Sequence, residues 1–453
     1  MRSRCPEARC GTGQWPVGRA PFPGGRSADA VGRELASPFL TPLAVALAAG
    51  LLLCAVGGCD RASGTSEAAP PAASSDPQID AQSLMALPYA GSVRGSEEDE
   101  QSGVMLYDEQ RSYPGYNLYS AHKLCRADLI DARGQIVRSW RHPGNNWANV
   151  ELLDNGDLLV VGAEPSDSDA PGAEDAGRYV LRFDFRGALL WKRHLTAHHD
   201  IEPTPDGGLM TITFRRRPIP AVHAKIDTRD DELTLLSAEG EIVQSLSLFD
   251  ALSRRPEIFP LRGFAPTRTP DGAWIDVFHA NSLERMAHAE LARKSELYDP
   301  ANILVCFRHQ DRVAVINWER QEVVWAWGLG EISGPHDAQT LPDGNILLFD
   351  NGLKAKRSRV IEIDPASGQI VWEYESDDPA DFFSVSKGSA QRLPNGNTLI
   401  ANSDSGQAFE VTRAGEKVWE FFCPHRDPKA QRGTIVRIKR YERDFIDKLL
   451  AGP

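Results

Sequence analysis

Short apolar runs alternate with polar turns along most of the chain, and two hairpin patterns follow one another. In the first pattern, a turn such as Pro-Asp-Gly or Asp-Asn-Gly stands between two aliphatic runs. In the second, a polar turn leads into a run that ends near a tryptophan. Asp-Gly and Asn-Gly pairs favour tight hairpins, because these residues tolerate a positive φ. The first pattern recurs at Gly156, Gly207, Gly272, Gly344 and Gly396, and the second at Gly134, Gly187, Gly240, the turn before Trp325, Gly368 and Gly415.

The spacing of these turns predicts a β-propeller. Consecutive turn glycines of the first pattern lie 51, 65, 72 and 52 residues apart, a period expected for four-stranded blades with loop insertions. The second pattern occurs six times and the first five times, so the most N-terminal hairpin lacks a mate, and the strand-like segment 433–438 can join it. We predict an all-β six-bladed β-propeller whose ring is closed by the N- and C-terminal segments, which removes exposed sheet edges. Seven blades or a two-sheet sandwich are the alternatives.

Tryptophans recur at one position of the predicted blades, near the end of the second hairpin. Large aromatic side chains at a repeated position indicate packing between sheets. These residues are Trp140, Trp191, Trp325, Trp372 and Trp419.

The N-terminal region has the pattern of an export signal. Residues 39–58 carry no charge and end in Val56-Gly57-Gly58-Cys59, which resembles a bacterial lipobox, in which the cysteine is lipidated and becomes the mature N-terminus. We expect residues 1–58 to be a signal peptide, residues 59–111 a flexible linker with Cys59 lipidated, and residues 112–453 the catalytic propeller. An uncleaved membrane anchor is the alternative. Both place the propeller in the cell envelope, in the periplasm or outside the cytoplasmic membrane. The long segment before residue 39 suggests that the true start lies after Met1.

Net charge and the distribution of basic residues limit the classes of molecule that the chain can bind. The 453 residues carry a formal net charge of −13, and the chain has no long Lys- or Arg-rich stretch. Phosphate backbones need a cationic surface, so nucleic acid is excluded as a partner. Beyond Cys59 the cysteines are Cys125, Cys306 and Cys423, an odd number. We expect them to be small core residues, with one disulfide at most as the alternative.

The candidate site follows from propeller geometry. The innermost strand of each blade starts near the central channel, so polar residues at those starts face a common funnel. Three of the five stretches contain histidine, although the chain has 11 histidines in total. The stretches are 147–149, 198–200, 278–282, 334–337 and 387–389.

Several motifs in these stretches resemble the arylsulfate sulfotransferase family over residues 112–440. They are His198-His-Asp-Ile201, Asp276-Val-Phe-His-Ala-Asn-Ser-Leu283, Phe307-Arg-His-Gln310 and the stretch from Gly334-Pro-His-Asp337 to Phe349-Asp-Asn-Gly352. Members of this family are six-bladed propellers that move a sulfuryl group from an aryl sulfate to a phenol without a nucleotide donor. The resemblance implies no cofactor, and small aryl sulfates and phenols as partners.

The resemblance also implies roles for individual residues. His336 corresponds to the transiently sulfurylated histidine, His199 and His279 to its supporting histidines, and Arg308 to the arginine that binds sulfate. Asn149 and Asn281 stand at inner-strand starts and are candidate substrate-binding residues. Asp337 is expected to point away from the partner that orients His336, so that partner is expected from another blade. A homodimer is left open.

Alternatives remain for the site and for the function. The three histidines can hold zinc with a water as fourth ligand, although an arginine beside the metal would repel it, and we expect no metal. A scaffold or ligand-binding envelope lipoprotein is the alternative function.

Asp200 and Asp337 are expected to brace adjacent blades, and residues 284–297 to form a short helix at the funnel mouth. Six other histidines are expected at the surface: His122, His142, His194, His223, His288 and His425.

Overall fold

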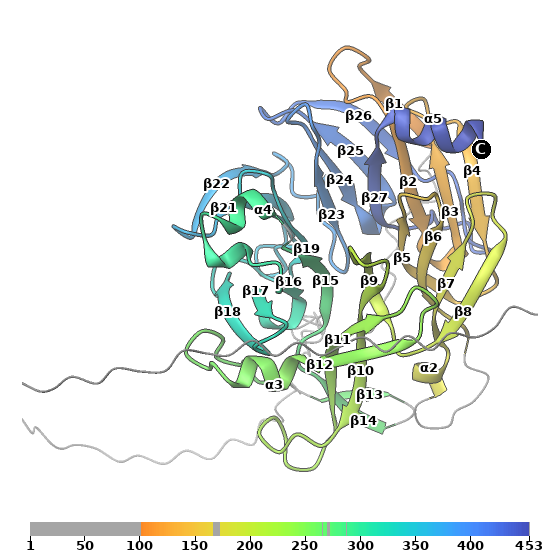
Figure 1. Ribbon diagram of the computed structural model, residues 1–453. Helices are drawn as coiled ribbons and strands as arrows, with labels where there is room; N and C mark the ends of the chain where they lie inside the picture. Colours follow the sequence, from red (N-terminus) through yellow and green to blue (C-terminus); the bar gives the residue numbers. More distant parts are fainter. Residues whose placement is uncertain (1–100, 166–172, 265, 270–271, 287, 453) are drawn as a thin grey trace, which may run out of the picture. The chain divides into compact units, whose positions relative to one another are not determined.

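The computed structural model describes residues 101–165, 173–264, 266–269, 272–286 and 288–452. Within them, six small sheets are arranged in a ring, with one innermost strand per sheet near the centre (Figure 1). Apolar clusters lie between neighbouring sheets, for example Ile212 and Leu233 of one sheet against Val305 and Ile316 of the next. The six-bladed β-propeller predicted from the turn spacing is confirmed.

The blades are numbered from the N-terminal end and their strands are given from the inside outwards. Blade 1 contains β27 (Ile435–Tyr441), β2 (Tyr116–Ala121), β3 (Arg126–Ile130) and β4 (Ile136–Arg141); blade 2 contains β5 (Asn146–Leu152), β6 (Leu158–Ala163), β7 (Arg178–Phe183) and β8 (Leu189–His194). Blade 3 contains β9 (His198–Pro203), β10 (Leu209–Arg217), β11 (Thr228–Leu236) and β12 (Ile242–Ser247); blade 4 contains β15 (Ala280–Arg285), β16 (Asn302–Phe307), β17 (Arg312–Asn317) and β18 (Glu322–Trp327). Blade 5 contains β19 (His336–Thr340), β20 (Ile346–Asp350), β21 (Arg359–Asp364) and β22 (Gln369–Tyr374); blade 6 contains β23 (Ser389–Arg392), β24 (Thr398–Asn402), β25 (Gln407–Val411) and β26 (Lys417–Phe422).

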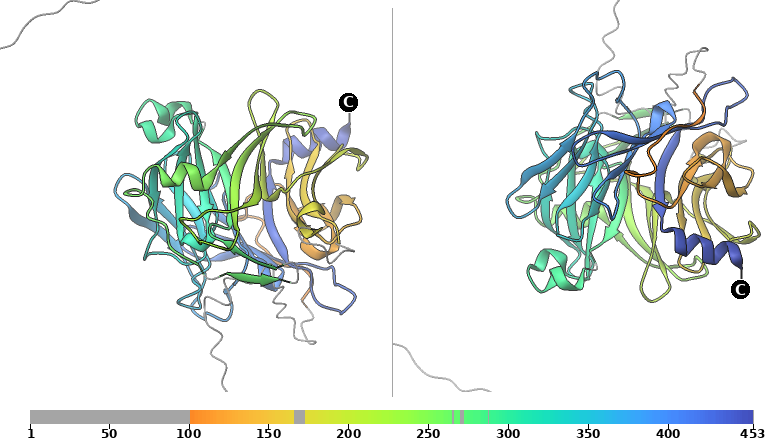
Figure 2. Two further views of the ribbon diagram at one scale, coloured as in Figure 1. Left: turned by 90° about the horizontal axis from the view of Figure 1, so that it is seen from below. Right: turned by 90° about the horizontal axis from the view of Figure 1, so that it is seen from above.

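The described helices are short except at the C-terminus. They are α2 (Ala173–Ala176), α3 (Leu248–Ser253), α4 (Ala289–Ala292), α5 (Arg443–Ala451) and the 3₁₀ turns η1 (His122–Leu124), η2 (Glu296–Tyr298), η3 (Arg308–Gln310) and η4 (Ser403–Ser405). Helix α5 lies beside blade 1 (Figures 1 and 2), where Ile446 joins the apolar cluster between blades 1 and 2. No helix among the described residues is long and apolar enough to cross a membrane. Residues 39–58 and Cys59 lie outside the described residues.

The two ends of the chain close the ring, as predicted. Strand β27 pairs antiparallel with β2 over a register that runs from Tyr116 opposite Tyr441 to Ala121 opposite Ile435. The strand predicted over 433–438 is therefore real, but it begins two residues later and ends three residues later, at Ile435–Tyr441. The expected linker 59–111 is wrong at its C-terminal end, because β1 (Gly103–Tyr107) pairs with β26 as an extra outer strand of blade 6.

The recurrent tryptophans connect neighbouring blades. The indole Nε1 of Trp140 donates to the Asp184 carbonyl at 3.0 Å, and that of Trp372 donates to the Arg413 carbonyl at 2.9 Å. Trp419 of blade 6 donates to the Ala132 carbonyl of blade 1 at 2.8 Å, so this contact also spans the closure of the ring. The predicted packing role is confirmed, and the N–H groups of Trp140, Trp325, Trp372 and Trp419 donate to carbonyls of the next blade.

Two details of the sequence prediction are wrong, one in the hairpin pattern and one in the position of a helix. The turn at Gly272 does not follow an inner strand, because β13 (Thr267–Thr269) and β14 (Gly272–Asp276) form a hairpin that extends blade 3, with β14 parallel to the start of β11. The helix expected at the funnel mouth, α4, follows the far end of β15, opposite to the end that adjoins His279. An apolar helical pattern shows that a helix forms, but not at which end of a strand it lies.

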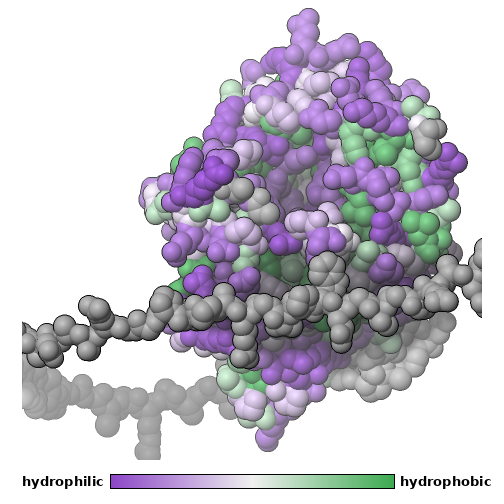
Figure 3. Space-filling view, viewed as in Figure 1, coloured by the Kyte–Doolittle hydropathy of each residue, from purple (hydrophilic) through white to green (hydrophobic). Residues whose placement is uncertain are grey.

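The three cysteines beyond Cys59 are buried and free, as expected for core residues. The face shown in Figure 3 is mostly hydrophilic, in keeping with the net charge of −13.

Candidate active site

Irregular strand starts position the candidate side chains. The ladders of β9, β15 and β19 each shift register near the beginning of the inner strand. His199, His279 and Asp337 there have φ values of 62°, 47° and 52°, a left-handed conformation that costs energy for residues with a side chain. Bulges of this kind change the direction of side chains. The histidines are therefore brought together by local distortion, not by identical places in regular strands.

The structure brings most of the predicted residues to one small cavity of about 20 Å³, enough for one water molecule. The side chains that bound it come from the inner strands of blades 1 to 6 or from the residues just before them. They are Asn149, His199, Asn281, His336, Asp337, Lys387 and Arg437.

His336 is held in one orientation and one tautomer. Its Nδ1 lies 2.7 Å from Oδ1 of Asn351 and 3.1 Å from the Gly334 carbonyl. The amide nitrogen of Asn351 donates to the carbonyls of Ser384 and Lys387, at 2.7 and 2.9 Å. Since that nitrogen must face the carbonyls, Oδ1 faces the imidazole and Nδ1 must carry the proton.

The other nitrogen of His336 carries the lone pair. Nε2 is buried and has no hydrogen-bond partner among the described residues. Burial, helped by the positive charge of Arg308, lowers the pKa of His336 to about 3. The ring is therefore neutral at physiological pH, with a lone pair on Nε2. The orienting partner was expected from another blade, which is wrong, because Asn351 follows β20 of the same blade.

His279 is paired with a buried carboxylate. Oδ2 of Asp276 lies 2.6 Å from Nδ1 of His279, and Oδ1 accepts the backbone N–H of His279 at 2.9 Å. Burial nevertheless lowers the pKa of His279 to about 3, because it outweighs the opposite effect of Asp276. The ring of His199 lies 4.9 Å from that of His279 and contacts His198 through the two Nδ1 atoms at 2.6 Å. Burial lowers the pKa of His199 as well.

The neighbouring His309 fixes the orientation of the Arg308 guanidinium. It begins η3, and its Nη1 lies 3.1 Å from Nε2 of His309, whose Nδ1 lies 2.6 Å from the carbonyl of Asp276. The carbonyl requires Nδ1–H on His309, so Nε2 accepts from the guanidinium. The backbone N–H of Arg308 donates to the His279 carbonyl at 3.3 Å. His309 thus links Arg308 to the loop that carries Asp276 and His279.

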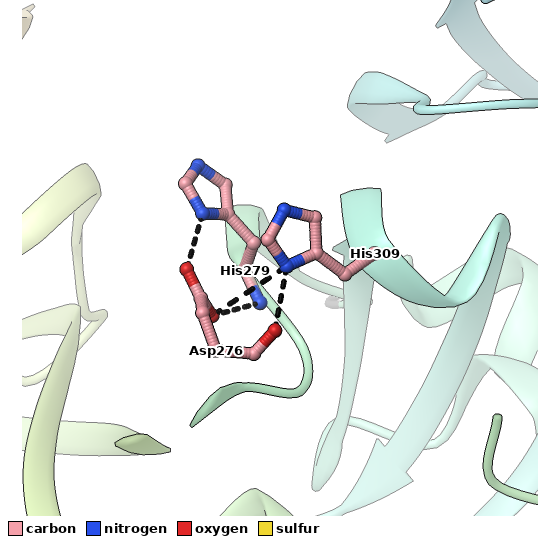
Figure 4. Close-up of side chains that lie close together, drawn as sticks. All are labelled: Asp276, His279 and His309. Atoms are coloured by element: carbon pink, nitrogen blue, oxygen red, sulfur yellow. Dashed lines mark hydrogen bonds and ion pairs between the residues drawn. The ribbon is translucent and has the colours of Figure 1, made fainter. Parts of the chain in front are cut away.

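A metal-like cluster lies behind the cavity. Asp276, His279 and His309 offer ligand atoms within 4.8 Å of one another (Figure 4). Both Nδ1 atoms point to oxygens of Asp276, and Arg308 donates to Nε2 of His309. A guanidinium at this place repels a cation, and the contacts fit a hydrogen-bonded array better than a metal centre. This group is not the zinc trio considered from the sequence, which was His199, His279 and His336.

The sequence model of one known family, described as arylsulfotransferase (ASST), matches residues 180–423, more than half of the 453 residues. The chain belongs to the arylsulfotransferase family. This confirms the resemblance seen in the funnel motifs, and it supports an arylsulfotransferase-like function in general terms. No curated protein matches the chain.

Three solved structures are similar to this arylsulfotransferase-family chain at low sequence identity. A protein of unknown function from Bacteroides caccae is 15% identical, with 72% of this chain and 98% of that chain covered and a TM-score of 0.43. A streptogramin B lyase is 12% identical, with 75% and 93% covered and a TM-score of 0.40. A catalytically inactive virginiamycin B lyase from Staphylococcus aureus with quinupristin is 12% identical, with 70% and 87% covered and a TM-score of 0.39.

The two asparagines line the family site, but with their acceptor atoms available. The amide nitrogen of Asn149 donates to Asp200 at 2.7 Å, and that of Asn281 donates to the Pro335 carbonyl at 2.8 Å. Their buried Oδ1 atoms have no hydrogen-bond partner among the described residues. In both residues the amide donor is used within the protein, and both residues line the cavity.

Arg437 of β27 pairs with both Asp200 and Asp337, and Arg437 and Asp337 line the cavity. The guanidinium contacts both oxygens of Asp200, at 2.9 and 3.1 Å, and Oδ1 of Asp337 at 2.7 Å. The expected bracing of adjacent blades is borne out, because Asp200 accepts from Asn149 of blade 2 at 2.7 Å and from the backbone N–H of Leu283 of blade 4 at 3.1 Å, and Asp337 accepts from the backbone N–H of Ala390 of blade 6 at 3.0 Å. Arg437 in addition joins the inner strands of blades 1, 3 and 5. The sequence did not indicate that Arg437 pairs with Asp200 and Asp337.

Some residues of the site were missed. His122 was expected at the surface, but it is buried, with Nδ1 2.9 Å from the Trp147 carbonyl. It begins η1, the turn of blade 1 that matches η3 of blade 4, where Arg308 stands. Lys387 lies in a stretch noted at an inner-strand start but was given no role. His425 is also partnered, by Asp128 at 2.6 Å. The repeated strand, 3₁₀ turn and strand is the signal that could have placed His122.

Proposed function

We propose that the protein is an arylsulfate sulfotransferase that moves a sulfuryl group from an aryl sulfate to a phenol through a transient sulfohistidine at His336, without a nucleotide donor. The observation that carries the proposal is the fixed tautomer of His336, with Nδ1–H on Asn351 and a buried lone pair on Nε2. A neutral imidazole is a good nucleophile at neutral pH. Membership of the arylsulfotransferase family supports the reaction class.

The first half-reaction forms one bond and breaks one. Nε2 of His336 attacks the sulfur, the bond between sulfur and the aryl oxygen breaks, and its electron pair goes to the departing phenolate. Arg308 binds the sulfuryl oxygens, because a planar guanidinium can give two parallel hydrogen bonds. In the second half-reaction the oxygen of a phenol attacks the sulfur and His336 leaves with its lone pair. A covalent route of this type replaces one difficult step by two easier ones.

In this reaction His279 and His199 are neutral polar side chains beside the reacting groups and do not act as acids. Both pKa values are lowered by burial, so both rings are neutral at neutral pH. Nδ1 of His279 is directed at Asp276, which fixes the orientation of the ring. The acceptor oxygens of Asn149 and Asn281 suit the hydroxyl of an acceptor phenol.

The aryl ring needs more room than the cavity offers. At about 20 Å³ the cavity admits roughly one water, so side chains of the funnel must move when a donor binds. A pocket of about 610 Å³ nearby is lined by Phe383, Val385 and Phe422, and also by Asp404, which pairs with Lys387 of the cavity. Apolar and aromatic walls suit a phenyl ring.

The test is transfer by the purified full-length protein from an aryl sulfate to a phenol, with and without a chelator. We expect ping-pong kinetics that do not depend on the chelator. With donor alone, the peptide that contains His336 should gain one acid-labile SO₃ unit, and His336→Asn should be nearly inactive. Sequential kinetics without an adduct, together with an active His336→Asn enzyme, would reject the proposal. Absence of transfer from any aryl sulfate would favour the scaffold alternative.

We also propose that the protein is a lipoprotein of the cell envelope, attached to the membrane through Cys59. The support is the sequence pattern Val56-Gly57-Gly58-Cys59 after an uncharged stretch. Extracytoplasmic placement would expose the site to small phenols without the need for a nucleotide donor.

A further inference from the structure

A buried lysine faces the nucleophile across the small cavity. Lys387 precedes β23, and only 3% of it is exposed. It borders the cavity together with His199, Asn281 and His336. Its backbone carbonyl accepts the amide hydrogen of Asn351 at 2.9 Å, and Asn351 in turn orients His336. The lysine and the nucleophile are thus fixed to the same amide.

The ammonium of Lys387 has a buried counter-ion. Nζ lies 2.9 Å from Oγ of Ser386 and 3.4 Å from Oδ1 of Asp404. Asp404 is itself fixed, because it accepts the backbone N–H groups of Val385 and Ser386 at 2.7 and 2.9 Å. A buried lysine with a carboxylate partner carries a charge that water does not screen. The removal of such a pair from water costs free energy, which points to a role for it in function.

The proposed reaction needs a second positive group. An aryl sulfate carries one negative charge, which Arg308 matches. When the bond between sulfur and the aryl oxygen breaks, a second negative charge develops on the phenolate oxygen. Stabilising charge that develops in the transition state is the largest catalytic effect available to such a site. Lys387 is the further cation at the cavity wall whose side chain is able to give up a proton, since an arginine keeps its own.

The other groups of the cavity are unsuited to proton transfer. The neutral rings of His199, His279 and His336 have no proton to give at neutral pH, apart from the one each keeps on a nitrogen. Asp337 is engaged by Arg437 at 2.7 Å. Among the described residues that line the cavity, this leaves Lys387 as the group that can give and take a proton.

We propose that Lys387 is the acid–base residue of the transfer reaction, an inference that rests on the proposed sulfotransferase function. In the first half-reaction, Nε2 of His336 bonds to sulfur, the aryl oxygen leaves with the electron pair, and Lys387 gives that oxygen a proton, which leaves a neutral amine. In the second half-reaction the amine takes the proton of the acceptor phenol, whose oxygen bonds to sulfur while His336 leaves. The two steps return every group to its starting state.

The electrostatics of the lysine suit this exchange. Burial lowers the pKa of Lys387 from its ordinary value of 10.5, Arg308 and Lys123 act in the same direction, and Asp404 opposes them. A phenol has a pKa of about 10. Proton transfer is efficient between groups of similar pKa, and it contributes roughly 10²–10⁴-fold to the rate of a reaction.

The first test compares donors that differ in the acidity of the leaving phenol. Release of the phenol is measured in single turnovers without acceptor, for wild type and Lys387→Met. With phenyl sulfate, we expect Lys387→Met to lose about 100-fold or more, since the poor leaving group needs the proton. With 4-nitrophenyl sulfate, whose phenolate is stabilised by the ring substituent, we expect a loss below about tenfold. An equal loss for both donors would overturn the proposal, because it would assign Lys387 to binding or to structure.

The second test uses the acceptor. With the sulfurylated enzyme prepared from 4-nitrophenyl sulfate, transfer to neutral phenol should be slowed in Lys387→Met, whereas transfer to an acidic, already ionised phenol should approach the wild-type rate. Lys387→Gln, which can still bond Asp404, provides a folded alternative if Lys387→Met is unstable. Lys429→Met, at an exposed lysine that does not line the cavity, should leave both comparisons unchanged. Slowing that is the same for neutral and ionised acceptors would reject the proposal. If wild type itself transfers nothing and forms no adduct, the proposed function fails instead.

Discussion

Nδ1 of His336 lies 2.7 Å from Oδ1 of Asn351, and the amide nitrogen of the same asparagine is held by two backbone carbonyls. The asparagine cannot flip without losing three hydrogen bonds. The direction of the His336 lone pair is therefore set by backbone carbonyls at residues 384 and 387, which lie just before the inner strand of the next blade. Two blades together fix the orientation of the proposed nucleophile.

Replacement of Asn351 tests this relationship. In Asn351→Ala the imidazole keeps one contact, to the Gly334 carbonyl at 3.1 Å, and is free to change tautomer or turn. We expect turnover with an aryl sulfate to fall on the order of 100-fold, the cost of a misplaced reactive group. Asn155→Ala, in an exposed turn of blade 2, should retain wild-type turnover. Unchanged turnover in Asn351→Ala would show that the asparagine does not position the nucleophile.

Asn351→Asp separates orientation from basicity. A carboxylate beside Nδ1 raises the pKa of His336 from its value of about 3. The wild-type enzyme should keep a neutral His336 down to about that pH, so its sulfurylation rate should not fall between pH 7 and 5 through this group. The variant should lose rate as the pH falls, because protonation removes the lone pair. Identical pH profiles for the two proteins would contradict the role.

Arg308 and His309 should act as one unit. We expect Arg308→Lys to lower turnover on the order of 100-fold or more, since lysine does not reproduce a preorganised planar donor pair. His309→Leu removes the acceptor 3.1 Å from Nη1 of Arg308, and it should raise KM for the donor more than it lowers kcat, because the guanidinium is still present but no longer aimed. The exposed His194→Leu is the control.

The double variant Arg308→Lys with His309→Leu makes the test specific. If His309 works only through Arg308, its loss should add little once Arg308 is replaced. Fully additive losses would mean that His309 has a separate role, and activity of Arg308→Lys within about threefold of wild type would remove Arg308 from the site.

The fold could be predicted further than the site. Turn glycines and repeated tryptophans depend on local sequence, and they predicted six blades and the pairing of both chain ends. The site depends on contacts between segments far apart in the chain, such as Arg437 with Asp200. The residues that carry a motif could be named from the sequence, but Asn351, His309 and Lys387 could not be given roles, because their partners lie in other loops. His122 was misplaced because an isolated histidine in a turn gives no sign of burial.

Arg437 should be a stabilising residue of the ring. It is the shared partner of Asp200 and Asp337, and its side chain is 11% exposed. Arg437→Met leaves two buried carboxylates without this partner, and loss of one member of a buried pair costs about 3–5 kcal/mol of unfolding free energy. We expect a drop of this size in chemical denaturation. The triple variant Arg437→Met, Asp200→Asn, Asp337→Asn should recover part of it, whereas a single variant as stable as wild type would contradict the bracing role.

Cys59 should determine attachment to the membrane. In Cys59→Ala the lipidated residue is absent, so the protein should remain as an unprocessed precursor or stay attached through residues 39–58. Mass spectrometry of the mature wild-type N-terminus should show a lipidated cysteine as the first residue. An unmodified Cys59 within an intact N-terminal segment would contradict the lipoprotein proposal.

Acid should destabilise the propeller from about pH 6.5 downwards. His122, His279 and His336 each have a pKa of about 3 in the folded protein, lowered from 6.5 chiefly by burial. Between these values the unfolded chain binds protons that the folded protein does not, so stability is complete above pH 6.5 and is lost as the pH falls towards 3. Each histidine contributes a slope of up to about 1.4 kcal/mol per pH unit. Urea denaturation between pH 7 and 5 should show this decline.

The histidine origin of that decline can be isolated. His122→Gln should reduce the slope by about one proton's share, about 1.4 kcal/mol per pH unit, because one buried titrating ring is removed. His194→Gln, at an exposed histidine, is the matched control and should leave the slope as in wild type. Carboxylates of ordinary pKa begin to titrate below this range, so they cannot produce a decline that starts near pH 6.5. Burial raises the pKa of Asp231 to about 6, so this carboxyl binds a proton in the folded protein first and opposes the decline. The comparison between variants is therefore decisive: an unchanged slope in His122→Gln would mean that His122 accepts a proton in the folded protein.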